Sequence, residues 1–523
     1  MTDHILTVRP SAQPLPREEQ LAWKLADVAT RTRTWPDAAA AMAANRLIDD
    51  AAVAVASLTR PPVAAARAQA AAHPRPGGAT VFGLANDRRV HAEWAAWANA
   101  VAVRELDFHD TFLAADYAHP GDAIPALVAV AQQTGASGAE LLRGILAAYE
   151  VHVALVKGIC LHCHKIDHMA HLCPATAAGI GAMLDLETPV VYQAIQQAVH
   201  VAFTTRQSRK GEISSWKAYV PGHSALLAIT AVDRAMRGEG APSPIYEGED
   251  SVVAWLLDGP DARYVVPLPD PDEPRAAILE TYTKAHSAEY QAQAFIDLAF
   301  ELRGRLPGGR DAIESGAVDG SAVDAGAIDV DAIDEILVRT SHHTHTVIGT
   351  GANDPQKTDP HASRETLDHS LMYIVAVALQ DGAWHHERSY ARARATREDT
   401  VRLMRKVRTE EDPAWTARYR DPDPSRRAFG GEMIVRLADG REVRGERLVA
   451  DAHPNGAAPF ARPDYALKFR ELAEGVVPEA EQRRFLALAE RLGELTPEEV
   501  AEANVQVPGL DADIVSGERA GIF

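Results

Sequence analysis

Between about residues 18 and 238, apolar residues recur at steps of three and four, the spacing of one face of an α-helix. Ser137 and Glu140 form a capping box ahead of one such series, which comprises Leu141, Leu142, Ile145, Leu146, Tyr149 and Val153. Thr188-Pro189 and Thr496-Pro497 give a similar start signal, with threonine as N-cap and proline at the first helical position. This Ala- and Leu-rich region is predicted to form a tightly packed all-helical body that can hold inward polar groups in place.

The pattern changes after about Thr281. Residues 335–340, EILVRT, alternate apolar and polar positions, and residues 433–437 do so again before Asp439-Gly440, a strong two-residue hairpin signal. Residues 304–331 are rich in Gly, Asp, Ala and Ser and are predicted to be a surface insertion. Helical patterning returns from Tyr465 onward.

These segments predict a mainly α protein with an α+β second domain. The large, discontinuous all-helical domain takes residues 15–280 and 458–523, and a smaller α/β lid domain takes residues 281–457.

Composition restricts the possible partners. The chain has 523 residues and a net charge of -20, with no dense block of Lys and Arg, which argues against nucleic acid. An anionic substrate would need a local basic pocket in this acidic surface. We expect no membrane span, because apolar runs such as residues 51–58 are too short, and no signal peptide. Three cysteines, an odd count, do not suit a disulfide framework, so a cytoplasmic location is expected.

A polar stretch, LDFHDTFLAADYAHPGD at residues 106–122, carries the strongest sign of chemistry. Four carboxylates, two histidines, Thr111 and Tyr117 surround a turn that breaks at Pro120-Gly121. Because Ala-rich apolar segments flank it, this stretch is predicted to connect two buried helices and to present polar side chains to a cavity there.

The segment CLHCHKIDHMAHLC, residues 160–173, allows two interpretations. Cys160, Cys163 and Cys173 could hold an iron–sulfur cluster with one open iron. A structural zinc site is not favoured, because it would need a second pair of ligands further along the chain and none follows. Alternatively, His168 at the head of an apolar helix could act in proton transfer, or it could be a capped loop residue.

Basic and mixed polar clusters supply candidates for substrate binding. Residues 206–224, RQSRKGEISSWKAYVPGHS, form a possible anion cradle, in which Arg209 and Lys210 are expected to be solvated and Lys217 lies between aromatic residues. Residues 283–293 and 368–373 add polar clusters ahead of apolar helices, and either could be structural.

The ordered motifs LDFHDTFLAADYAHPGD, IDHM, SSWKAYVPG, SAEYQAQ, DHSLMYIVA and EDPAWTARYRDPDPSRR resemble those of the 2-methylcitrate dehydratase family. The resemblance covers nearly the whole chain except the N-terminal tail and residues 304–331. This family is similar in fold to cis-aconitate decarboxylase. The resemblance implies a large helical domain, a smaller α/β lid, a homodimer and no cofactor or metal.

The resemblance also implies dehydration of 2-methylcitrate, a tricarboxylate, to 2-methyl-cis-aconitate in propionate breakdown by the methylcitrate cycle. Citrate and cis-aconitate are further candidate ligands. By motif, the implied catalytic residues are His119, His168, Asp107 and Lys217, and the implied substrate-binding residues are Thr111, Arg206, Lys284, His286 and Tyr373. Relatives often have a histidine in the lid motif where this chain reads Ala288-Glu289-Tyr290-Gln291, so whether His286 replaces it is open.

Dehydration needs a base for the C–H proton, an acid for the leaving hydroxyl, and donors for the carboxylates. Our hypothesis is that His119 and His168 form the acid and base pair, in either order, with Asp107 orienting one imidazole. The alternatives are an iron–sulfur hydro-lyase using the three cysteines, a decarboxylase of cis-aconitate, and a non-catalytic helical binding protein.

Overall fold

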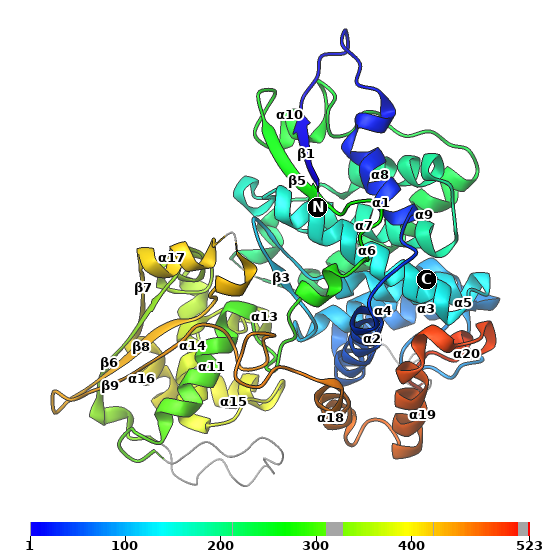
Figure 1. Cartoon of the computed structure of the whole chain (residues 1–523). Helices are drawn as coiled ribbons and strands as arrows, with labels where there is room; N and C mark the ends of the chain where they lie inside the picture. Colours follow the sequence, from blue (N-terminus) through cyan, green and yellow to red (C-terminus); the bar gives the residue numbers. More distant parts are fainter. Residues whose placement is uncertain (1, 212, 310–327, 422, 511–520, 523) are drawn as a thin grey trace.

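The computed structural model describes residues 2–211, 213–309, 328–421, 423–510 and 521–522. Part of the predicted insertion at 304–331 therefore lies outside the described residues. The predicted mainly α class with an α+β part is confirmed, and Figure 1 shows a helical body beside a smaller part that contains a sheet. In the described chain no helix combines the length and the apolar character needed to cross a membrane.

The helical body contains the chain up to Leu268 and also its C-terminal helices. Its helices are α1 (Leu21–Thr30), α2 (Asp37–Ser57), α3 (Pro61–Ala71), α4 (Ala92–Glu105), α5 (Ile124–Thr134), α6 (Gly138–Gly158), α7 (Met169–Met183), α8 (Thr188–Ala202), α9 (Trp216–Met236), α10 (Val252–Leu256), α18 (Arg462–Ala473), α19 (Glu479–Glu490) and α20 (Pro497–Ala501). The predicted capping box at Ser137 is present. The predicted N-cap at Thr496 is also present, and there the side chain of Glu499 completes a capping box. At Thr188 the prediction is wrong by one residue, because Glu187 is the N-cap.

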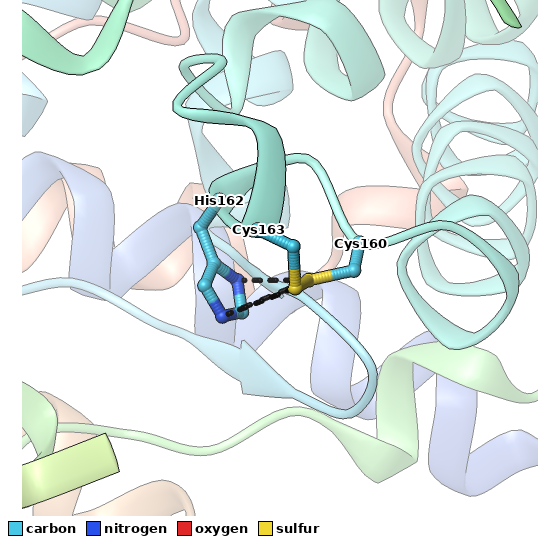
Figure 2. A group of neighbouring side chains, drawn as sticks. All are labelled: Cys160, His162 and Cys163. Atoms are coloured by element: carbon cyan, nitrogen blue, oxygen red, sulfur yellow. Dashed lines mark hydrogen bonds between the residues drawn. A yellow bond between two sulfur atoms is a disulfide. The ribbon is translucent and has the colours of Figure 1, made fainter. Parts of the chain in front are cut away.

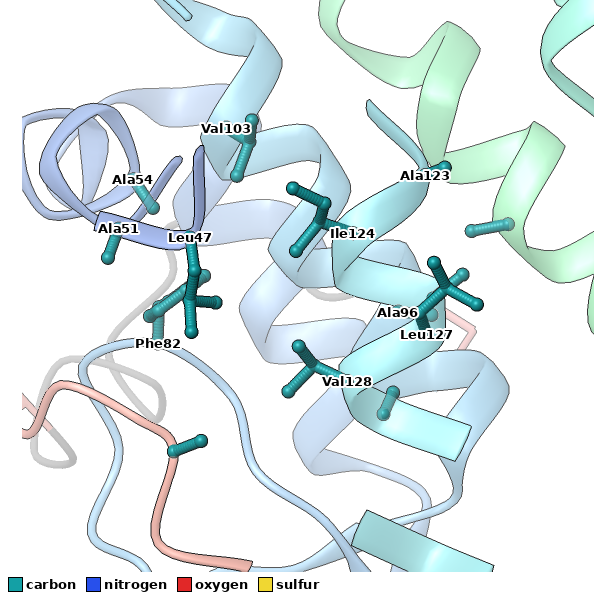
Figure 3. Close-up of a cluster of buried hydrophobic side chains, with 14 of the residues drawn as sticks. Leu47, Ala51, Ala54, Phe82, Ala96, Val103, Ala123, Ile124, Leu127 and Val128 are labelled. Atoms are coloured by element: carbon teal, nitrogen blue, oxygen red, sulfur yellow. The ribbon is translucent and has the colours of Figure 1, made fainter. Parts of the chain in front are cut away.

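Small side chains let these helices approach closely. In Figure 3, apolar residues of α2, α4 and α5 meet in one cluster that includes Leu47, Val103 and Ile124. A Cβ placed on Gly144 of α6 would lie 3.0 Å from the carbonyl oxygen of Gly179 in α7. Such close packing gives the rigid scaffold that the Ala-rich sequence predicts.

Short strands also belong to the body. β1 (Thr2–Thr7) pairs antiparallel with β5 (Arg263–Leu268), and β3 (Phe112–Leu113) pairs with β4 (Tyr117–Ala118) inside the polar stretch. A further strand, β2 (Pro74–Ala79), precedes α4. The sequence pattern did not predict these strands.

The smaller part has a four-stranded sheet in the order β7-β6-β8-β9. Its elements are α11 (Tyr290–Arg303), β6 (Ile333–Thr340), α12 (His342–Val347), α13 (Arg364–Leu367), α14 (Leu371–Asp381), α15 (Arg392–Ala395), α16 (Glu398–Lys406), β7 (Val407–Glu411), α17 (Pro413–Tyr419), β8 (Gly431–Leu437) and β9 (Glu442–Arg447). Ile336 pairs with Val435 across β6 and β8, and Gly440 turns the predicted hairpin with a φ of 85°.

Each part has its own apolar core. One cluster of buried residues lies between Ala288 and Val443, whereas the largest cluster combines residues 39–278 with C-terminal residues from Tyr465 to Leu510. Helix α18 thus packs on α2 of the body, and its Lys468 donates to the carbonyl of Phe108 in the polar stretch at 2.7 Å. We call the part that contains residues up to Leu268 and the C-terminal helices the body, and the part from α11 to β9 the lid.

Candidate active site

A small cavity of about 40 Å³ lies where loops of the body meet the lid. Six of the predicted site residues line it, namely Asp107, Thr111, His119, His168, Arg206 and Lys284. Other polar lining residues were not predicted as site residues, namely Arg104, Tyr117, Arg209, Glu289, His343 and His369. A larger hollow of about 250 Å³ beside β1 is lined by none of the predicted residues. The cavity thus joins motifs that lie far apart in the sequence.

Asp107 is the centre of a buried cluster of cations. It follows α4 in a left-handed backbone conformation with a φ of 49°, which aspartate tolerates better than most side chains. Its carboxylate lies 2.7 Å from Lys284 Nζ, 3.0 Å from Arg104 Nη1 and 3.1 Å from Lys217 Nζ. Burial alone would raise its pKa, but these three cations hold the pKa well below the ordinary value. Asp107 is therefore ionised and orients Lys284 toward the cavity.

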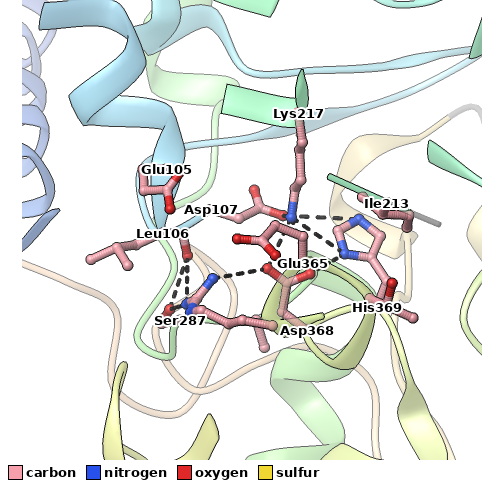
Figure 4. Close-up of polar contacts among 12 residues, drawn as sticks. Glu105, Leu106, Asp107, Ile213, Lys217, Ser287, Glu365, Asp368 and His369 are labelled. Carbon is pink, nitrogen blue, oxygen red and sulfur yellow. Dashed lines mark hydrogen bonds and ion pairs between the residues drawn. The ribbon is translucent and has the colours of Figure 1, made fainter. Parts of the chain in front are cut away.

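Lys217 lies behind Asp107. Its ammonium, only 1% exposed, donates to both carboxylate oxygens of Asp368 at 3.0 and 2.9 Å, and the two residues come from α9 and from the end of α13 (Figure 4). Lys217 does not line the cavity. Its contacts place it as a link between body and lid that holds Asp107 in position.

His119 presents an unoccupied ring nitrogen to the cavity. Its Nδ1 lies 2.8 Å from the backbone carbonyl of Asp110, which can only accept, so Nδ1 carries the proton. No described residue donates to Nε2. Burial, followed by the charges of Arg104 and Lys284, lowers the pKa of His119 well below its ordinary value. A neutral imidazole with an exposed lone pair is the form that a general base requires.

His168 lies next to His119, with 5.6 Å between the ring centroids. It is the N-cap residue of α7, which begins at Met169, so its predicted place at the head of a helix is confirmed. Its Nδ1 is 3.0 Å from Asp167 and its Nε2 is 3.6 Å from Asp122. Two carboxylates therefore flank the ring and fix its orientation.

Two arginines that line the cavity carry N–H groups without a hydrogen-bond partner among the described residues. Arg209 pairs through Nε with Asp167 at 3.3 Å, while its Nη1 and Nη2 are buried without a partner among the described residues. Arg206 stacks over Tyr117, and its Nε is likewise buried and unpaired. The expectation that Arg209 is solvated is wrong, because the turn η4 (Arg206–Arg209) folds back against the body. Unpaired guanidinium groups in a cavity are suited to binding carboxylates.

Glu289 and two histidines complete the cavity from the lid side. Glu289 is the N-cap of α11, and burial raises its pKa to about 7. Burial and nearby cations lower the pKa of His343 to about 3, and burial and Lys217 lower that of His369 to about 4, so both rings are neutral. Sequence reasoning noted the polar cluster around Glu289 but did not assign it a role, because burial beside the Asp107 cluster follows from tertiary contacts.

Three other candidates lie differently from the expectation. Thr111 lines the cavity, but its hydroxyl donates to the carbonyl of Ala118 at 2.9 Å. His286 does not line the cavity and pairs with Asp297 at 2.9 Å. The Tyr373 hydroxyl donates to the carbonyl of Ser389 inside the lid core. The structure therefore does not bring His286 or Tyr373 to the cavity.

The three cysteines are not available as three thiolates. Cys160 and Cys163 form a disulfide, contrary to the expectation from the odd count. Cys173 is buried in α7 and donates to the carbonyl of Ser224 at 3.6 Å, and burial raises its pKa to about 12. A cluster that needs all three as thiolates does not fit this arrangement.

Two segments of this chain match the two domains of one known protein family. Residues 19–265 match the MmgE/PrpD N-terminal domain, and residues 286–494 match the MmgE/PrpD C-terminal domain. The chain belongs to the MmgE/PrpD family. The resemblance carried by the ordered motifs is thereby confirmed, and both matched segments of this MmgE/PrpD protein supply cavity residues.

Three curated relatives of this MmgE/PrpD chain are named as 2-methylcitrate dehydratases. A 2-methylcitrate dehydratase of Cupriavidus necator is 26% identical over 456 residues, which cover 83% of this chain and 85% of the relative. A 2-methylcitrate dehydratase of Escherichia coli K12 is 25% identical over 423 residues, covering 76% and 78%. A mitochondrial 2-methylcitrate dehydratase of Yarrowia lipolytica is 23% identical over 380 residues, covering 70% and 66%.

Proposed function

We propose that this MmgE/PrpD protein is a hydro-lyase that dehydrates 2-methylcitrate to 2-methyl-cis-aconitate within propionate catabolism. The observation that carries the proposal is the pairing of a neutral His119, whose Nε2 is free, with unpaired guanidinium groups in one cavity. The names of the relatives support the choice of substrate. No metal or cofactor enters the proposed steps.

Substrate carboxylates would bind to the cationic side of the cavity. Arg206 and Arg209 offer free N–H groups, and Lys284 adds a positive charge held by Asp107. This local excess of positive charge counters the acidic surface of a chain with net charge -20. Charge-assisted hydrogen bonds of this kind are about twice as strong as neutral ones.

The proton transfers fall to different groups. We assign His119 Nε2 as the base that removes the C–H proton beside a carboxylate, because the ring is neutral and its Nδ1–H is fixed by the carbonyl of Asp110. We assign His168 as the acid that protonates the departing hydroxyl, which leaves as water. Glu289 is the second candidate for the acid, since its pKa of about 7 keeps a proton on it near neutral pH.

Substrate access requires the lid to move. A water molecule needs about 10–15 Å³ of cavity volume, so a cavity of about 40 Å³ holds roughly three waters and no tricarboxylate. The buried ion pair of Lys217 with Asp368 holds lid and body together in this closed form. We propose that binding alternates with separation of the lid.

The test is an ultraviolet assay for unsaturated tricarboxylate, run with and without a chelator and followed by mass analysis. The proposal predicts loss of water from 2-methylcitrate and no effect of the chelator. Loss of carbon dioxide from cis-aconitate would instead favour the decarboxylase alternative, and activity on citrate is measured in the same way. Stabilisation by tricarboxylates without turnover would favour a binding protein.

We also propose that the enzyme is a homodimer, as the family resemblance implies, and that it is cytoplasmic, as expected from the cysteine content. Light scattering during gel filtration would measure this. A mass twice that of the 56.4 kDa chain is expected, and a monomer at micromolar concentration would contradict it.

A further inference from the structure

The loop between α6 and α7 gathers two sulfurs and an imidazole outside the cavity. Ligand atoms of Cys160, His162 and Cys163 all lie within 4.8 Å of one another. Figure 2 shows the His162 ring facing both sulfurs. Cys163 is exposed and the other two are partly buried, so reductants and ions can reach the group from solvent. These three residues, which we call the CHC loop, have no part in the proposed dehydration.

We propose that the CHC loop, when its disulfide is reduced, is a binding site for a thiophilic divalent cation of the zinc class. The spacing of the atoms supports this. Cys160 Sγ lies 3.4 and 3.6 Å from the two ring nitrogens of His162, and Cys163 Sγ lies 3.9 Å from Nε2. Tetrahedral zinc with its usual bond lengths places a sulfur and a nitrogen ligand about 3.5 Å apart.

The surroundings prepare His162 as a ligand. Its Nδ1 lies 2.6 Å from the buried carboxylate of Asp116, whose second oxygen accepts from the Leu161 backbone N–H at 2.9 Å. This carboxylate fixes the tautomer that leaves Nε2 free for a metal, as in carboxylate–histidine–zinc arrangements. The chain supplies both the ligand and the group that orients it.

The backbone already forms a tight turn between the two cysteines. His164 N–H donates to the Leu161 carbonyl at 3.0 Å, and Lys165 closes the turn in a left-handed conformation with a φ of 61°. A turn that brings Cys-x-x-Cys sulfurs together is typical of zinc-binding loops. A water molecule would complete the coordination, because only three protein ligands are at hand in the described loop.

Reduction of the disulfide by a phosphine makes the two thiols available, and it needs no other oxidant or reductant. A phosphine reduces the disulfide to two thiols and becomes a phosphine oxide, with water supplying the oxygen and the two protons. Cation binding then releases the two thiol protons, because thiolates are the ligands. The disulfide form has no thiolate to offer, so binding depends on the redox state.

The site lies beside the cavity without lining it. The His162 ring is 5.3 Å from Tyr117 and 5.2 Å from His343, centroid to centroid, and both of these residues line the cavity. Tyr117 belongs to the body and His343 to α12 of the lid. An ion here would therefore sit at the junction of the two parts.

The test uses the full-length protein and Co²⁺ as a spectroscopic substitute for zinc. Phosphine-reduced protein, without air, is titrated with Co²⁺ and then with Zn²⁺. We expect one equivalent of cobalt, a thiolate-to-cobalt charge-transfer band, tetrahedral ligand-field bands, and loss of both on adding zinc. Oxidised protein should show none of these bands.

Variants separate this site from other histidines and from the remaining thiol. Cys160→Ser with Cys163→Ser should abolish the charge-transfer band, whereas Cys173→Ala should keep it. Asp116→Asn should weaken cobalt binding by about 10- to 100-fold, with the metal-free melting temperature checking its fold. A reduced wild type without the band, or a band that survives in the double serine variant, would overturn the proposal. Because turnover is not measured, the result is independent of the proposed dehydration.

Discussion

Replacing Asp107 by Asn removes the negative charge at the centre of the cation cluster. Asparagine keeps the shape and tolerates the left-handed φ of 49°, so the substitution changes mainly the electrostatics. Arg104 and Lys284 then lose their carboxylate partner, whereas Lys217 keeps Asp368. Breaking a buried ion pair by removing one partner costs about 3–5 kcal/mol. We expect the whole cluster to lose about this amount, since its contacts are not additive.

The matched control is Asp185→Asn. Asp185 also has a positive φ, 54°, but its pair with Arg33 is on the surface, with side chains 49% and 62% exposed. Such a pair contributes about 0–1 kcal/mol. A chain of 523 residues unfolding cooperatively loses about 1 °C of Tm per kcal/mol. Calorimetry should therefore show a Tm lower by about 3–5 °C for D107N and by less than about 1 °C for D185N.

The direction in which the Tm difference between wild type and D107N changes with pH follows from the pKa of Asp107. Because the pKa of Asp107 is lower in the folded protein than in the unfolded chain, its stabilisation is complete above the unfolded pKa of about 3.9. It is lost as pH falls through the folded pKa. The Tm difference between wild type and D107N should thus persist from about pH 5 to 8 and shrink in more acidic solution. A D107N difference no larger than that of D185N would refute the assignment of Asp107 as the centre of the cluster.

Three further predictions concern residues that line the cavity or were expected to do so. Glu289→Gln should lower kcat and remove the loss of kcat/KM above about pH 7 if Glu289 is the acid, and an unchanged pH profile would assign that role elsewhere. Arg206→Gln should raise KM for 2-methylcitrate by about 10- to 100-fold, the loss of one charged hydrogen bond, with little change in kcat; an unchanged KM would exclude the contact. Tyr373→Phe should leave kcat unchanged but lower stability by about 1 kcal/mol, seen in calorimetry, and a large loss of kcat would return Tyr373 to the site.

Local sequence rules predicted much of the fold. The capping box at Ser137 and the hairpin at Asp439-Gly440 follow from short-range chemistry, so both could be predicted from a few residues. The pairing of β1 with β5 joins Thr2 to Leu268, and no local pattern encodes a contact over that distance. Such long-range pairings depend on the packed body rather than on strand propensity.

The site was predicted where a motif presents its own chemistry. His119 and Lys284 lie in polar segments that line the cavity, and both were named from the sequence. Arg104 was not predicted, because it lies in the last turn of an apolar helix. Arg209 was expected to be solvated, but in the structure η4 packs against the body and Arg209 pairs with Asp167. Tyr373 looked equally polar in its motif but points into the lid core. Side-chain direction, which depends on tertiary packing, separates these cases.

The assignment of His119 as the base of a dehydration of 2-methylcitrate can be checked by the initial rate of 2-methyl-cis-aconitate formation by wild type and His119→Ala. His200→Ala, at an exposed histidine of α8, is the control. We expect kcat to fall by about 10²- to 10⁴-fold in His119→Ala and to stay at the wild-type value in His200→Ala. A folded His119→Ala enzyme with the wild-type rate would contradict it.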